Sequence, residues 1–208
     1  MLIIPELEKV VILIPRTGTG TLYRAVLAKY PKAFLLYRHM EADGVPRGYD
    51  RWERCTIVRH PLNRLWSLYN WLQTFSYEKH NNNYVNKMRE SVNRPFEDWL
   101  LNNEIPFSTP YDSAYRGRFY PEFTCNHPIP ENRKSQFKYA RPDLGTNIYH
   151  FSKVDLYYKH LGINDVDTIH NANDYAQNNV PILSTTAIDY MHNCFAWDLE
   201  FCNKFIRQ

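Results

Sequence analysis

The sequence lacks the features that mark several large classes of protein. No stretch approaches the roughly 18 consecutive apolar residues that span a membrane. The four cysteines contain no C-x-x-C pair, which disfavours a zinc site, and we expect reduced thiols. The net charge is only +3, from 25 basic and 22 acidic residues, which is too weak to indicate a nucleic-acid partner. The N-terminal segment has no basic region of the signal-peptide kind, so we expect a cytoplasmic protein.

Apolar runs alternate with helical patterns over the first third of the chain. Runs at residues 10–14, 33–37 and 55–58 predict three buried strands. Apolar spacing predicts a helix over residues 19–29 and a second helix from Pro61, because proline suits the first helical position. This order predicts an α/β fold in three αβα layers around a central parallel sheet, built as a single domain of 208 residues.

The remainder of the chain is less regular at first and then resumes the same alternation. Residues 76–145 are rich in asparagine, proline and charge, and they include a short helical pattern over residues 95–101. We interpret this region as an irregular insertion that covers the active face and forms an acceptor-binding lid. A strand over residues 147–151, a helix over 153–161 and a long helix over 185–205 are predicted to follow.

The segment between the first strand and the first helix has the composition of an anion-binding loop. It contains, in order, Thr17, Gly18, Thr19, Gly20 and Thr21. A strand, a loop of small residues and a helix together present backbone N–H groups to an anion. The segment has neither the Gly-Lys pair of the Walker A motif nor the third glycine of the dinucleotide-binding motif. The spacing therefore disfavours kinases and NAD enzymes.

A second segment, residues 56–71, reads TIVRHPLNRLWSLYNW. Together with IPRTGTGTL at residues 14–22, it resembles the sulfotransferases that use 3′-phosphoadenosine 5′-phosphosulfate (PAPS), above all the carbohydrate-type branch. Those enzymes carry a loop of the form PKTGTT[ST]L and the pattern VRxPxxRxxSxY. The resemblance implies a P-loop NTPase-like sulfotransferase fold. It also implies sulfuryl transfer from PAPS to a carbohydrate hydroxyl, without a metal, and release of 3′-phosphoadenosine 5′-phosphate (PAP).

The resemblance also implies a role for each matching residue. The phosphosulfate is expected to contact the loop, namely Arg16, Thr17, Gly18, Thr19, Gly20 and Thr21. Arg59 and Ser67 match the arginine and serine that bind the 3′-phosphate, and Arg64 on the same general side of the helix could add charge. The geometry suits these roles, since Arg59 follows a strand and its planar guanidinium fits phosphate oxygens. Weaker likenesses lie at residues 134–137 and 170–173, and at Trp197-Asp198.

Two residues are predicted to carry the catalytic chemistry. Arg16 stands where the family has a lysine that contacts the bridging oxygen, so it is expected to offset charge on the leaving phosphate. His39 follows the second predicted strand and is the candidate general base, with His60 as its rival. Arginine in place of lysine leaves open a non-catalytic protein that binds nucleotides or sulfated ligands. A nucleotide kinase with an aberrant P-loop is the other alternative.

Overall fold

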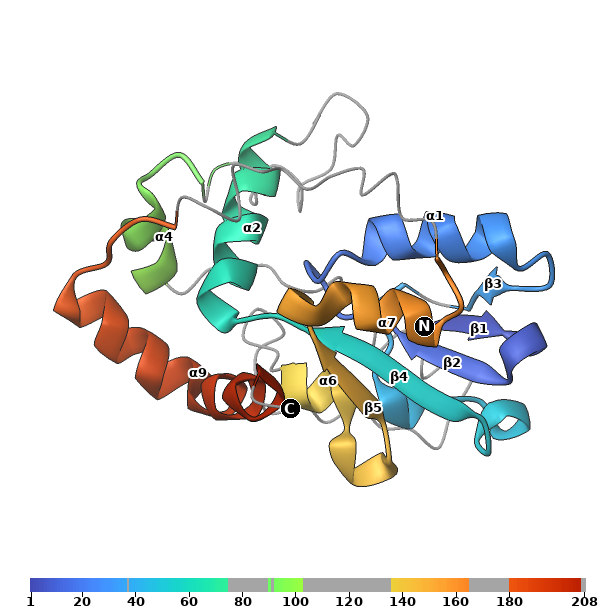
Figure 1. Ribbon diagram of the computed structural model, residues 1–208. Coiled ribbons are helices and arrows are strands. Elements are labelled where there is room, and N and C mark those ends of the chain that lie inside the picture. Colours follow the sequence, from blue (N-terminus) through green and yellow to red (C-terminus); the bar gives the residue numbers. More distant parts are fainter. Residues whose placement is uncertain (37, 75–89, 91, 103–135, 165–179, 207–208) are drawn as a thin grey trace.

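The computed structural model describes residues 1–36, 38–74, 90, 92–102, 136–164 and 180–206 (Figure 1). Most of the predicted insertion over residues 76–145, and the likeness at residues 170–173, lie outside these ranges. No helix in the described ranges is both long enough and apolar enough to cross a membrane.

The centre of the protein is a five-stranded mixed sheet. In spatial order its strands are β3 (Phe34–Leu35), β1 (Leu2–Ile4), β2 (Lys9–Ile12), β4 (Glu53–Val58) and β5 (Asn147–His150). Strands β2, β4 and β5 run parallel, and Cys55 of β4 pairs with Val11 on one side and Asn147 on the other. Strand β1 is antiparallel to both of its neighbours. The α/β class is confirmed, but the prediction of a purely parallel sheet is wrong.

The antiparallel part of the sheet follows from a tight reversal near the start of the chain. Pro5–Leu7 form a single 3-10 turn, and Glu8 adopts a left-handed conformation with φ of 51°. Such a short connection can join only antiparallel neighbours, because parallel strands need a long crossover. Strand β1 therefore occupies the place beside β2. As a result β3 lies at the edge, where Phe34 and Leu35 are exposed instead of buried as predicted.

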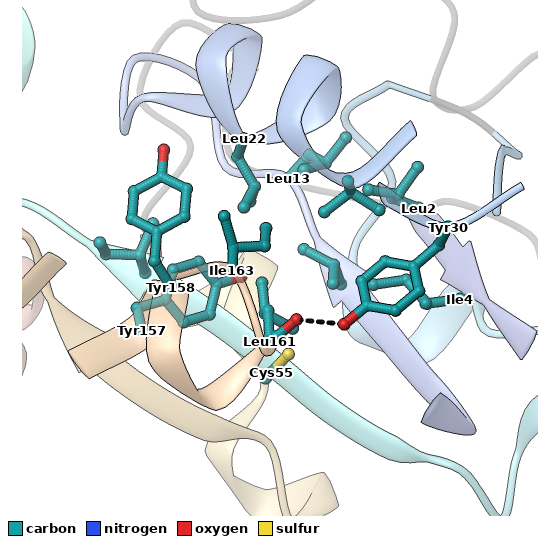
Figure 2. Close-up of a cluster of buried hydrophobic side chains, with 13 residues drawn as sticks. Leu2, Ile4, Leu13, Leu22, Tyr30, Cys55, Tyr157, Tyr158, Leu161 and Ile163 are labelled. Atoms are coloured by element: carbon teal, nitrogen blue, oxygen red, sulfur yellow. Dashed lines mark hydrogen bonds between the residues drawn. The ribbon is translucent and has the colours of Figure 1, made fainter. Parts of the chain in front are cut away.

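Helices cover both faces of this sheet. Helix α1 (Thr19–Lys29) begins and ends where its apolar spacing predicted, and it packs with α7 (Val154–His160) on one face. Figure 2 shows the buried cluster between them, in which the Tyr30 hydroxyl donates to the Leu161 carbonyl at 2.7 Å. Short helix α6 (Gln136–Ala140) and the end of α9 (Thr185–Ile206) pack on the opposite face.

A second apolar cluster lies beyond the sheet, at the left of Figure 1. It joins α2 (Pro61–Thr74), α4 (Phe96–Leu101) and the first half of α9, with Leu72 and Trp99 among its buried side chains. Helix α9 contributes to this cluster and to the apolar packing with α6 on the sheet, and its backbone leaves helical geometry at Phe195, where φ is −123°. The sequence predicted one uninterrupted helix, and the break lies between the half that packs on α2 and the half that packs on the sheet.

Candidate anion-binding site

The predicted anion loop and Arg59 come together with Phe151 at one edge of the sheet. Because β2, β4 and β5 are parallel, their carboxyl ends meet at this edge. The loop from Leu13 to Gly18 follows β2, Arg59 follows β4, and Phe151 follows β5. A Cβ atom built on Gly18 would lie 3.1 Å from the Phe151 ring, and the Arg59 guanidinium lies 4.9 Å from the centre of the same ring. The loop and Arg59 therefore flank a common aromatic side chain.

The loop ends in a helix N-terminus that faces this edge. Gly18 is the N-cap of α1 with φ of 79°, a left-handed conformation that glycine adopts without strain. Thr19 and Gly20 begin the first turn, where backbone N–H groups lie beyond the reach of carbonyls within the helix. The Thr17 hydroxyl donates to the Ile14 carbonyl at 2.9 Å, so it holds the loop in shape. The backbone N–H groups, more than the Thr17 hydroxyl, suit an anion here.

Arg59 carries a buried charge that no acceptor offsets within the described ranges. Only 6% of the residue is exposed, and its guanidinium lies against Phe151. Burial lowers the pKa of Arg59 to about 10, so the side chain stays charged at neutral pH. Removing a charge from water without a partner is unfavourable, and a bound anion removes that penalty.

Arg16 adds a second guanidinium to the same region. It adopts a left-handed conformation, with φ of 65°, which costs a residue other than glycine about 1 kcal/mol. Burial and the neighbouring charges of Arg59 and Arg38 lower the pKa of Arg16 to about 10. The side chain remains charged, and positive charge is concentrated at this edge. Such a concentration attracts a ligand with more than one negative group.

Ser67 is not the free hydroxyl that its place on the helix predicted. It is 6% exposed, and Arg16 Nη2 donates to both its hydroxyl and its carbonyl at 3.0 Å. The Arg16 guanidinium also lies 5.3 Å from the centre of the Trp71 ring. The two residues that the resemblance assigned to opposite ends of the nucleotide are thus in direct contact. Their separate roles stay predictions.

Arg64 does not supply charge to the site as expected. The residue is 1% exposed, its Nε donates to the Pro15 carbonyl at 2.9 Å, and Nη1 lies 3.7 Å from the Asp198 carboxylate. Burial lowers the pKa of Arg64, and Asp198 opposes that shift. Arg64 therefore fastens the start of the loop to α9. The apolar period of α2 indicated its helix face, but nothing local to that helix indicated a buried carboxylate from α9.

Gln136 is a further part of the site whose contacts sequence reasoning did not predict. Its Oε1 accepts from the Arg59 N–H at 2.9 Å, and its Nε2 donates to the Arg59 carbonyl at 2.7 Å. The Gln136 N–H in turn donates to Asp198 Oδ2 at 3.0 Å. Both residues fall in segments that gave the weaker likenesses to the family, but the sequence carried no indication of what they contact.

His39 lies beside the loop as a neutral imidazole. Its Nδ1 lies 2.8 Å from the Leu13 carbonyl and so must carry the hydrogen, which leaves a lone pair on Nε2. Burial, together with the charges of Arg38 and Arg64, lowers the pKa of His39 to about 3. That value lies far below the near-neutral pKa expected of a base, although a bound anion would raise it. Burial also lowers the pKa of the rival, His60.

In the described part of the chain, no group of three or more histidine, cysteine, aspartate or glutamate side chains is arranged to hold a metal ion. Comparisons of the chain with protein-family models, curated proteins and solved structures find no match. The case for a function therefore depends on the sequence motifs and on the residues at this edge of the sheet.

Proposed function

We propose that this protein is a sulfotransferase that moves the sulfuryl group of PAPS to a hydroxyl, most simply one on a carbohydrate. The observation that carries the proposal is the buried Arg59 guanidinium, which has no acceptor in the described ranges and lies beside the N-terminal end of α1. A structural arginine in such a place is normally paired with a carboxylate, as Arg64 is with Asp198. Arg59 is suited instead to an anion that arrives with a ligand.

The charge distribution favours a nucleotide with two separate anionic groups. The N-terminus of α1 and Arg16 would bind the 5′-phosphosulfate, while Arg59 would bind the 3′-phosphate. ATP has its negative charge in one chain of phosphates and offers nothing on the ribose for Arg59. The sequence also lacks the Gly-Lys pair that holds the β- and γ-phosphates in kinases.

The proposed reaction needs positioning, a base and charge stabilisation. The acceptor hydroxyl oxygen attacks sulfur in line as the bond from sulfur to the bridging phosphate oxygen breaks, and its proton passes to Nε2 of His39. The negative charge that develops on the departing 5′-phosphate would be offset by Arg16 and the N–H groups of α1. Nδ1 of His39 already donates to Leu13, so Nε2 is the nitrogen that can accept this proton.

Calorimetry with three nucleotides tests the binding half of the proposal. We expect PAP to bind without Mg²⁺ and to bind more tightly than adenosine 5′-phosphate or ATP. Arg59→Ala should weaken the affinity for PAP by about 10- to 100-fold, as expected for the loss of charged hydrogen bonds. The affinity for adenosine 5′-phosphate should stay almost unchanged. Arg24→Ala, at an exposed position of α1, is the matched control. Equal affinity of the wild-type protein for PAP and adenosine 5′-phosphate would contradict the role of Arg59.

A saccharide acceptor screen with sulfur-labelled PAPS tests the catalytic half. A specific observation favours the alternative of a non-catalytic binding protein, because Arg16 replaces the family's lysine and is hydrogen-bonded to Ser67. His39→Ala separates the two readings. In an enzyme it abolishes transfer while PAP affinity stays within about twofold, whereas a binding protein transfers no label in either form. Tighter binding of ATP with Mg²⁺ than of PAP would instead support a kinase.

A further inference from the structure

One side chain, that of Gln136, bonds to both the N–H and the carbonyl of Arg59. Strand β4 ends at Val58, and immediately beyond it the N–H and the carbonyl of Arg59 both bond to the Gln136 amide, at 2.9 Å and 2.7 Å. A primary amide offers one acceptor and a donor side by side, as a peptide group does. The Gln136 side chain therefore extends the hydrogen-bonded ladder of the sheet by one residue and fixes the orientation of Arg59.

This amide is itself fixed by a buried network. Gln136 is 0% exposed and Asp198 1%, and the Gln136 N–H donates to Asp198 Oδ2 at 3.0 Å. Asp198 is paired with Arg64, whose Nε donates to the Pro15 carbonyl at 2.9 Å. The chain of contacts thus runs from the backbone of Arg59 to the start of the anion loop. Arg59 and the anion loop are therefore held by the same network of buried contacts.

The network also keeps negative charge away from the Arg59 side chain. Its one carboxylate, Asp198, is engaged by Arg64 and by backbone N–H groups of α6. The group that contacts Arg59 is an uncharged amide, and it contacts only the backbone. The two buried arginines Arg64 and Arg59 therefore differ in whether a carboxylate of the described residues pairs with the side chain. Arg64 has a counterion within the protein, whereas Arg59 is oriented without being neutralised.

We propose that Gln136, supported by Asp198, is a positioning residue that holds Arg59 ready for the 3′-phosphate of the nucleotide. This role rests on the proposed function, and it makes a specific claim about which part of the ligand Gln136 affects. Substitution of Gln136 should weaken recognition of the 3′-phosphate alone. General damage to the fold would weaken every nucleotide alike.

The ratio of PAP affinity to adenosine 5′-phosphate affinity tests the role. Gln136→Met keeps the volume and loses both hydrogen bonds, and we expect PAP to bind at least tenfold more weakly while adenosine 5′-phosphate changes by less than twofold. In an Arg59→Ala background the same substitution should cause no further loss. Cys202→Ala is the control, because Cys202 is equally buried and donates more weakly to the same carbonyl, at 3.3 Å. It should leave the ratio unchanged.

Two outcomes would overturn the role of Gln136 and leave the proposed function intact. One is an equal loss of affinity for PAP and for adenosine 5′-phosphate. The other is a loss of PAP affinity that adds to the loss caused by Arg59→Ala. A wild-type protein that binds no PAP would overturn the proposed function, and this role with it. Hydrogen exchange of the Arg59 amide tests the contact between Gln136 and the Arg59 backbone without any nucleotide. The slow exchange expected for the wild type should become fast in Gln136→Met. If Gln136→Met fails to fold, Gln136→Asn keeps an uncharged amide that is one methylene too short to reach both groups of Arg59, and the same lowered ratio is expected.

Discussion

Arg16 donates two hydrogen bonds to Ser67, one to the hydroxyl and one to the carbonyl, each 3.0 Å long. The pair connects the anion loop to α2. Both bonds come from Nη2, whose two N–H groups point in fixed directions within the guanidinium plane. The arginine at this position therefore has a structural consequence as well as a charge.

Substitution of Arg16 separates its charge from its geometry. Arg16→Met removes the positive charge that would stabilise the negative charge on the departing phosphate, and we expect kcat to fall by about 100- to 1000-fold. Arg16→Lys keeps the charge and restores the residue type of the family's loop, so kcat should stay within about tenfold of the wild type. Both are measured by transfer from labelled PAPS. An unchanged kcat in Arg16→Met would remove Arg16 from the chemistry.

Two glycines of the loop should respond in opposite directions to alanine. Gly18 has φ of 79°, and an added Cβ would lie 3.1 Å from the Phe151 ring, so Gly18→Ala should lower the free energy of unfolding by about 1–2 kcal/mol. Gly20 lies in the first turn of α1 with no atom near the added Cβ, so Gly20→Ala should raise it by about 0.5 kcal/mol. Urea unfolding measures both, and equal effects would contradict the described loop conformation.

The features that the sequence predicted well are those decided within a single segment. Helix α1 matches residues 19–29 because the small-residue loop, the apolar spacing and the Tyr30-Pro31 break all lie in that stretch. The position of Arg59 directly after a strand was predicted because the apolar run that ends at Val58 can be recognised locally. Local patterns of this kind need no knowledge of the rest of the chain.

The features that the sequence missed depend on which distant segments meet. Strand β1 has three residues and is defined by pairing, so its short apolar run did not reveal it or the edge position of β3. The place of Arg64 on its helix suggested a charge for the ligand site, yet Arg64 is buried and paired with a carboxylate from α9. Gln136 in the same way acquires its role only when α6 packs beside β4.

The buried pair of Arg64 and Asp198 should matter far more to stability than an exposed pair. Asp198→Asn leaves the Arg64 charge buried without a counterion, and we expect a loss of about 3 kcal/mol in the free energy of unfolding. Asp143→Asn breaks an exposed ion pair in which Arg141 Nη2 and Asp143 Oδ2 lie 2.8 Å apart. We expect it to change the free energy of unfolding by less than about 0.5 kcal/mol. Chemical denaturation compares the two, and similar losses would contradict the buried network.

Acid should destabilise the protein through histidines whose pKa values are lowered in the folded chain. The pKa of His39 is lowered to about 3, and the pKa values of His60 and His150 are also lowered by burial. The unfolded chain then binds more protons than the folded chain between about pH 3 and 6.5, so stability is complete above that range and falls as pH falls through it.

His39→Asn keeps a donor for the Leu13 carbonyl and removes the titrating group, which makes it a direct test of this dependence. We expect the difference in unfolding free energy between pH 7 and pH 5 to be smaller in His39→Asn than in the wild type. An identical difference in the two proteins would show that His39 is not the group responsible.

The bond from Arg64 to Asp198 also governs when the site can exist during synthesis. The loop, β4 and α2 leave the ribosome first, whereas Asp198 emerges with the last described helix. Until then Arg64 lacks the Asp198 carboxylate, so burial of its charge beside Pro15 is unfavourable. The loop and Arg64 consequently reach their final arrangement only after α9 has been made, and fragments that stop before α9 should lack it.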